Sequence, residues 1–222
     1  LVSTIKKPFS YLVPYYRFPS TYIIHAANSK EVKRLASIPL IEDLPKGFMA
    51  VREGRRSFKW RVDKPASICF VSALDNGDPK KDVQFRDELF QFDAPFKNDP
   101  VAILKTQNRY YQSSWCNDTL AIVSDYWWNN RNQKTYLFNP SNPSKEPSII
   151  SDRNYQDRYS DPGDFVEERN RYGEYVLLLR NKNLFLIGDG FSADGQFPFL
   201  DELKIGTFKK KRIYESTIEG KK

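Results

Sequence analysis

The chain has 222 residues, 40% hydrophobic and 15% aromatic, and carries a formal net charge of +7 from 35 basic and 28 acidic residues. Aromatic content at this level is typical of folded, strand-rich proteins and argues against a disordered chain. Because charges of both signs are interspersed, and no window approaches 18 apolar residues, we expect no nucleic-acid partner and no membrane partner.

Strand signals are short, and turn residues separate them along the whole chain. The sequence predicts strands at residues 9–13, 22–26, 32–36, 57–61, 68–71, 101–105, 112–115, 120–125, 135–138, 148–151, 175–179, 184–188 and 212–216. Helical periodicity is scarce, and the charged stretch 164–171 is predicted as a loop element with at most a turn or two of helix. The basic run 209–212 is predicted in a hairpin turn.

A hairpin-like segment recurs four times, beginning at Tyr22, Phe90, Tyr136 and Phe199, with spacings of 68, 46 and 63 residues. Each copy has an aromatic-led apolar run, a polar turn, and a second run of apolar and basic residues. Two further predicted strands precede the second and third copies, and Trp60 and Trp115 occupy matching places in them. We expect these two rings to pack between neighbouring units, with ligand stacking as the alternative.

Four short strands repeated at this period are typical of a β-propeller blade. The sequence therefore predicts an all-β fold, a partial β-propeller of about four blades of four-stranded antiparallel sheet. We expect a single propeller region over residues 1–222, with approximate blades at 1–40, 41–106, 107–152 and 153–216. An array that does not close leaves strand edges exposed, so we also expect self-association.

The sequence offers few groups for catalysis. The one histidine, His25, lies in the first hairpin, where a strand residue is the simplest interpretation, and no G-x-S-x-G elbow is present. One histidine with Cys69 and Cys116 cannot form a zinc site of ordinary spacing. Neither catalytic residues, nor a metal, nor a cofactor is therefore predicted. The cysteines are expected as free thiols, although a pair between them stays open.

Four arginines fall within ten residues: Arg52, Arg55, Arg56 and Arg61. The guanidinium group presents a fork that matches a carboxylate in a bidentate manner. The cluster precedes and enters a predicted blade, so it could lie at the mouth of the propeller and bind acidic groups. The alternative is that these arginines pair with acidic residues of neighbouring blades.

Several ordered motifs resemble a known family: FSYLVP (9–14) with RFP (17–19), LIED (40–43), VR (51–52) with Gly54, RS (56–57), WR (60–61), DKP (63–65), WC (115–116) with DTLA (118–121), and YSDPG (159–163). Together they are similar to the N-terminal β-propeller of prolyl oligopeptidase-type serine peptidases, in the glutamyl endopeptidase branch. The resemblance covers most of residues 9–180 and fades toward the C-terminus.

The resemblance implies a propeller joined to a C-terminal α/β-hydrolase domain that carries a Ser–Asp–His triad. This chain has no hydrolase segment, so it is not expected to hydrolyse peptides alone. We expect a non-catalytic part that gates and positions peptide substrates for that domain. Arg52, Arg56 and Arg61 are the expected substrate-binding residues for acidic side chains.

Two alternatives remain open. The first is a stand-alone propeller-like scaffold for protein interactions, and the second is a basic nucleic-acid-binding β protein. The missing initiator Met suggests that the chain was processed or cut from a longer parent. The compartment stays open, because the resemblance is compatible with a soluble exported protein (bacterial periplasm) or a plastid protein.

Overall fold

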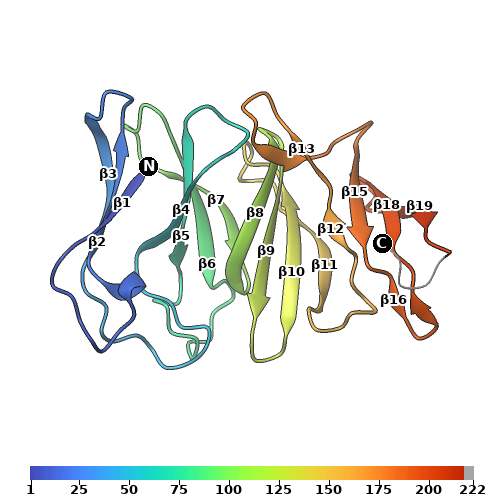
Figure 1. The fold of residues 1–222 in the computed structure, drawn as a ribbon, viewed down its shortest axis with the longest axis horizontal. Coiled ribbons are helices and arrows are strands. Elements are labelled where there is room, and N and C mark those ends of the chain that lie inside the picture. Colours follow the sequence, from blue (N-terminus) through green and yellow to red (C-terminus); the bar gives the residue numbers. More distant parts are fainter. Residues whose placement is uncertain (218–222) are drawn as a thin grey trace. The chain divides into compact units, whose positions relative to one another are not determined.

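The computed structural model describes residues 1–217, and its regular structure consists of β-strands and one three-residue 3₁₀-helix, η1 (Tyr15–Arg17) (Figure 1). The chain divides into two compact units, Leu1–Trp60 with Ala66–Lys105 and Arg61–Pro65 with Thr106–Lys222. No helix in the described part has the length and apolar character needed to span a membrane.

The first unit contains two antiparallel sheets. A three-stranded sheet has the order β1 (Val2–Ile5), β2 (Ser20–His25), β3 (Glu31–Ile38). A four-stranded sheet has the order β4 (Arg55–Trp60), β5 (Ser67–Ala73), β6 (Asp87–Asp93), β7 (Val101–Thr106). Sequential neighbours pair in both sheets, through turns or through longer connections such as residues 6–19 and 74–86.

Aromatic and branched side chains form the core of the first unit. The buried members are Ile24, Leu35, Phe58, Ile68, Phe70, Phe92 and Phe96. Strand β5 is buried along most of its length, so its apolar run SICFV needs no polar alternation. Phe70 stacks on Phe90 at 5.2 Å between ring centroids and nearly parallel. Burial of each such side chain stabilises the fold by roughly 1.5–3 kcal/mol.

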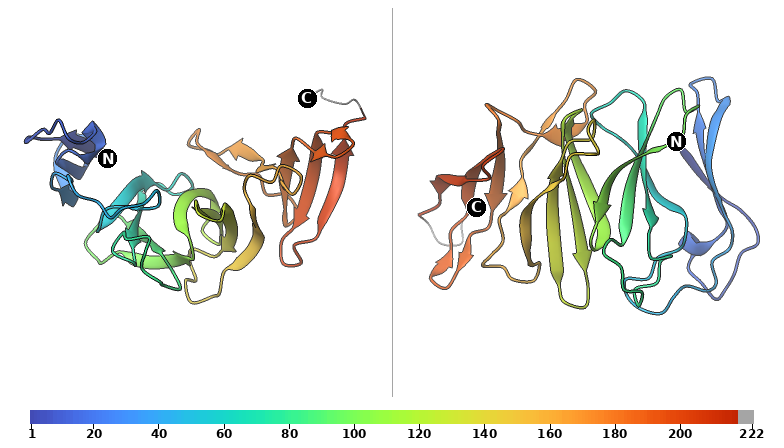
Figure 2. Two further views of the ribbon diagram at one scale, coloured as in Figure 1. Left: turned by 90° about the horizontal axis from the view of Figure 1, so that it is seen from below. Right: turned by 180° about the vertical axis from the view of Figure 1, so that it is seen from behind.

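The second unit contains two four-stranded antiparallel sheets and two short ladders. The first sheet has the order β11 (Ser148–Asn154), β10 (Asn132–Phe138), β9 (Leu120–Trp127), β8 (Arg109–Asn117). The second has the order β12 (Asp164–Phe165), β15 (Asn183–Gly188), β18 (Phe199–Lys204), β19 (Lys210–Glu215), drawn in orange and red in Figure 2. The ladders are β13 (Glu167–Arg169) with β14 (Tyr175–Leu177), and β16 (Phe191–Ser192) with β17 (Gly195–Gln196).

A buried carboxylate links β9 to β10 and to the residue that precedes β8. Asp125 is fully buried in β9 and accepts hydrogen bonds from the backbone N–H groups of Asn108 at 2.9 Å and Lys134 at 3.1 Å. The hydroxyl of Tyr136 donates to the same carboxylate at 2.8 Å. Burial is the largest influence on Asp125 and raises its pKa, while these donors lower it.

The predicted all-β fold built from four-stranded antiparallel sheets is confirmed, and it is consistent with a partial propeller. All four recurring segments are β-hairpins, formed by β2–β3, β6–β7, β10–β11 and β18–β19. The first sheet has three strands rather than four. The blade boundaries stay a prediction.

Three local predictions were wrong. Residues 9–13 form no strand, and their side chains at Tyr11 and Leu12 are almost fully exposed. Residues 164–171 are not a helical loop, because most of them belong to β12 and β13. The basic run 209–212 lies mainly in β19, an edge strand, where it exposes charge at an otherwise unpaired edge.

Candidate functional site

The predicted substrate-binding arginines fall in different settings. Arg52 precedes β4 and Arg56 lies within it, both in the first unit. Arg61 directly follows β4 in sequence but belongs to the compact second unit. The structure therefore brings Arg52 and Arg56 into one unit and assigns Arg61 to the other.

Arg52 lines an open groove of about 750 Å³ in the first unit, formed by residues 36–45, 51–55 and Asn76. Its guanidinium donates to the backbone carbonyls of Glu53, at 2.9 Å, and of Arg55. Desolvation by burial is the main cause that lowers the pKa of Arg52. The groove also contains the acidic side chains of Glu42 and Asp43, so its charge is mixed.

Arg56 forms an ion pair with Asp87, whose side chain is almost fully buried. The pair joins β4 to β6 across the sheet. The other terminal nitrogen of Arg56, Nη1, is buried and has no hydrogen-bond partner among the described residues. A buried donor in this state carries an unfavourable desolvation energy, and a ligand could bind it only if the Arg56 side chain moved outward.

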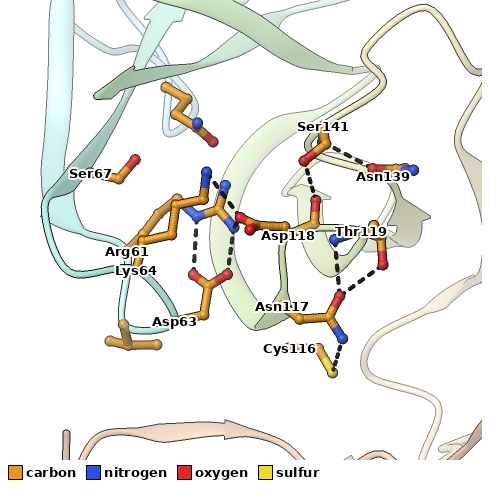
Figure 3. Close-up of polar contacts among 12 residues, drawn as sticks. Arg61, Asp63, Lys64, Ser67, Cys116, Asn117, Asp118, Thr119, Asn139 and Ser141 are labelled. Atoms are coloured by element: carbon orange, nitrogen blue, oxygen red, sulfur yellow. Dashed lines mark hydrogen bonds and ion pairs between the residues drawn. The ribbon is translucent and has the colours of Figure 1, made fainter. Parts of the chain in front are cut away.

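Arg61 is held in a buried polar network within the second unit (Figure 3). Its Nε donates to Asp63 Oδ1 at 3.0 Å, and its Nη2 donates to Asp63 Oδ2, so the pair is bidentate. Neither side chain has appreciable exposure, at 0% for Arg61 and 3% for Asp63. The Arg61 guanidinium carbon also lies 4.2 Å from the centroid of the Trp115 ring.

Further contacts fix the segment Arg61–Pro65 to the rest of the second unit. Lys64 Nζ forms an ion pair with Asp118 Oδ1 at 2.9 Å, in the turn between β8 and β9. Asn170 Nδ2 donates to the Val62 carbonyl at 2.7 Å, from a loop more than a hundred residues away in sequence. These contacts make Arg61 part of a structural clamp with no exposed guanidinium surface.

The two tryptophans predicted to occupy matching places differ in burial. Trp115 is 6% exposed and packs against Phe138 as well as Arg61, which confirms a packing role. Trp60 is 38% exposed, with its ring 6.3 Å from that of Phe96. Trp60 therefore lies at the surface of the first unit to a substantial extent.

The remaining candidates for reactive chemistry are His25 and the two cysteines. His25 ends β2, as predicted, and its Nδ1 lies 2.9 Å from the Ser29 carbonyl, whereas a triad histidine bonds a carboxylate at this nitrogen. Both cysteines are free thiols. Burial, followed by nearby acidic groups, raises the pKa of Cys116 to about 11. Within residues 1–217, no three acidic, histidine or cysteine side chains gather as a metal site would require.

Sequence reasoning missed one feature, a pocket lined by aromatic side chains in the second unit. Its rings come from Tyr111, Tyr126, Trp128 and Tyr155. The signal available in the sequence was the recurrence of aromatic residues near the predicted ends of strands. Only the sheet register shows that they meet.

No protein-family model matches the chain. Among curated proteins, the chain is 36% identical over 226 residues to a probable chloroplastic glutamyl endopeptidase of Oryza sativa subsp. japonica. It is 37% identical over 227 residues to a protein of the same name in Arabidopsis thaliana. Both matches cover 99% of this chain and 24% of the relative, so the chain spans about a quarter of the length of these curated relatives. The predicted resemblance to glutamyl endopeptidases is therefore confirmed, and it covers almost the whole chain rather than mainly residues 9–180: the chain is homologous to one part of larger proteins named probable glutamyl endopeptidase.

Proposed function

We propose that this chain is the non-catalytic β-propeller part of a serine peptidase of the glutamyl endopeptidase kind. In this role it limits access to the active site and positions peptides for an α/β-hydrolase domain elsewhere in the longer protein. The observation that carries the proposal is similarity over 99% of the chain to about a quarter of proteins named probable glutamyl endopeptidase.

The architecture of the described part supports a binding role. Its sheets provide a rigid framework, and loops on such a framework commonly carry contacts to ligands. The single histidine is engaged with a backbone carbonyl in its own hairpin. The chemistry of peptide hydrolysis is therefore assigned to residues outside this chain.

We further propose that Arg52 and Arg56 help to receive acidic substrate side chains. Arg52 lines the open groove, whereas Arg56 is mostly buried and paired with Asp87, so its side chain would have to turn outward to meet substrate. Arg61 was predicted to share this role. Because its bidentate partner Asp63 and the Trp115 ring already surround it, Arg61 would need to leave the clamp to meet substrate.

The longer protein is the right material for the test. Cleavage after Glu and after Gln would be compared in otherwise identical short peptides, for Arg52→Ala and Arg56→Ala. The matched control is Arg34→Ala, whose exposed pair with Glu31 spans 3.3 Å. One lost charge-assisted hydrogen bond is worth about 1.5–3 kcal/mol, so the preference for Glu should fall about tenfold or more. Unchanged preference in both variants would remove the arginine proposal.

Gating has a separate readout. A short peptide should be cleaved efficiently, while the same sequence inside a stably folded host protein should resist cleavage under native conditions. Equal cleavage of a peptide and of its folded host, with the host shown to remain folded, would contradict a gating role while leaving the arginine result unaffected.

A further inference from the structure

An aromatic pocket of about 360 Å³ opens at one end of the β8–β11 sheet. Its lining residues come from consecutive strands or their ends: Tyr111 in β8, Tyr126 in β9, Trp128 just after β9, Gln133 in β10, and Tyr155 just after β11. All of them belong to the second unit. The strands that meet at this end are labelled in Figure 1.

Edge-to-face contacts organise three of the rings. The Tyr126 ring lies 5.6 Å from that of Tyr111 and 6.2 Å from that of Tyr155, with interplanar angles of 81° and 80°. Such contacts stabilise a defined arrangement of rings beyond their buried area. The pocket is therefore organised before any ligand binds.

A β-bulge directs one ring of the pocket. Tyr110 pairs with Asp125 and Gln112 pairs with Ser124, so Tyr111 is an extra residue in β8 without a partner position in β9. A bulge bends the strand and re-aims a side chain, and bulges are enriched beside functional sites. The Tyr111 side chain, at 56% exposed, is consequently presented at the surface rather than packed into the core.

The core of the second unit does not use these rings. Its buried cluster is formed by Leu120, Ile122, Leu177, Leu184, Leu186 and Leu203. Two of the rings, Tyr111 and Trp128, are exposed, and Tyr126 and Tyr155 are partly buried. Aromatic side chains that gather in a concave site with one amide group fit a ligand pocket better than a packing surface. The pocket therefore suits a ligand that has an apolar ring or chain and a group that can hydrogen-bond to the amide.

Charge decides the class of ligand. Among the described residues, no charged side chain lines the pocket, and the nearby guanidinium of Arg131 lies 3.9 Å from the centroid of the Trp128 ring that lines it. A cationic ligand about 8 Å from this group would meet repulsion on the order of 2 kcal/mol at an effective dielectric constant of 20. A neutral ring with a carboxylate beside it would instead gain from Arg131.

Proline satisfies these requirements. Extended proline-rich segments dock in aromatic-lined grooves, and their backbone carbonyls accept hydrogen bonds from groups such as the Gln133 amide. From the rings, the amide and the guanidinium that stacks on Trp128, we infer that this pocket binds an extended peptide segment with a proline and a neighbouring acidic residue. The inference stands independently of the proposed peptidase role.

The test uses the 222-residue chain and a fluorescein-labelled peptide of three prolines flanked by glutamates, followed by fluorescence anisotropy. Binding should saturate, and Tyr111→Ala and Tyr155→Ala should each weaken it about tenfold, or 1.4 kcal/mol. The matched control is Tyr172→Ala, at an exposed tyrosine in the turn between β13 and β14, which should bind as the parent chain does.

A peptide with lysine flanks should bind more weakly than the one with glutamate flanks, and Arg131→Glu should reverse that order. Circular dichroism and thermal unfolding of each variant establish that it is folded; the Arg131→Glu reversal tests the pocket even if one tyrosine variant does not fold. Three results would overturn the inference: no saturable binding of the glutamate-flanked peptide, equal weakening by Tyr172→Ala, or preferential binding of tetramethylammonium at the same rings.

Discussion

Replacing Arg61 with alanine separates a structural role from a substrate-binding role. In the structure this guanidinium is fully buried between the carboxylate of Asp63 and the ring of Trp115. Arg61→Ala leaves Asp63 as a buried carboxylate without its bidentate partner. A substrate-facing arginine on an open surface would leave no such charge behind.

The expected loss of unfolding free energy in Arg61→Ala follows from the burial of the ion pair. Removing one partner of a buried ion pair typically costs 3–5 kcal/mol, because the remaining charge is desolvated and uncompensated. The lost guanidinium–indole contact, worth about 2 kcal/mol when desolvated, places the expected loss toward the upper part of that range. For comparison, the exposed pair of Arg34 with Glu31 should contribute at most about 1 kcal/mol.

Urea unfolding followed by tryptophan fluorescence provides the assay, at a protein concentration low enough to keep the chain dispersed. Asp63→Ala should cost a similar amount, and the double variant should cost clearly less than the two single losses together. An Arg61→Ala loss no larger than that of Arg34→Ala would refute the clamp and return Arg61 to the candidates for substrate binding.

Three further predictions concern stability and reactivity. Tyr136→Phe removes a donor to Asp125, so unfolding free energy should fall by about 1.5–3 kcal/mol. Because that bond lowers the pKa of Asp125, its loss raises the folded-state pKa further, and urea unfolding should show a larger deficit near pH 7 than near pH 4. Gly77→Ala would place a Cβ 1.8 Å from the Val51 carbonyl oxygen at a φ of +78°, so thermal unfolding should report a loss of about 2–4 kcal/mol. The Cys116 thiol, with a pKa of about 11, should react with a disulfide reagent near pH 8 roughly a hundredfold more slowly than a free cysteine.

Matched controls make these outcomes decisive. Tyr172→Phe tests loss of a hydroxyl at an exposed site, and a deficit as large as that of Tyr136→Phe would contradict the buried-carboxylate argument. Gly173→Ala has a similar φ of +81°, but within residues 1–217 no atom lies within 4 Å of the added Cβ, so it should cost only the backbone strain. Equal losses of unfolding free energy in the two glycine variants would contradict the predicted clash with Val51. Rapid labelling located at Cys116 in the native chain would contradict its raised pKa.

The all-β fold could be predicted because its signals are local. Each recurring hairpin combines an apolar run led by an aromatic residue with a polar turn, and these patterns specify antiparallel neighbours without knowledge of distant contacts. The hairpin beginning at Tyr136, for example, became β10 and β11, which pair through most of their length. Short-range turn chemistry was sufficient there.

The local predictions that were wrong depend on contacts with residues distant in the sequence. Residues 9–13 have strand-like composition, but no strand pairs with them, and pairing rather than propensity makes a strand. Glu167–Arg169 reads as a charged loop, yet it pairs with β14 across an intervening turn. The basic run moved into β19 because the turn before it closes earlier, with Gly206 and Phe208 both at positive φ.

For the candidate sites too, the sequence predicted the chemistry of the side chains but not which partners they meet. The four clustered arginines predicted a site that binds carboxylates. In the structure, two carboxylates of the chain itself occupy two of them: Asp87 pairs with Arg56, and Asp63 pairs with Arg61. The second lies only two residues away, reachable because the segment turns after β4 instead of extending. The aromatic pocket depends on the register of four strands, which composition alone does not specify.

The central claim is that this chain is the non-catalytic part of a larger serine peptidase, and active-site labelling tests it most directly. Protein from the native source would be treated with a fluorophosphonate, which modifies activated serines, and the adduct located by peptide mass spectrometry. The account predicts a labelled species about four times heavier than 26.0 kDa that contains this sequence, with its adduct outside these 222 residues. An adduct on a serine within this chain, or an unlabelled native species of 26.0 kDa, would contradict it.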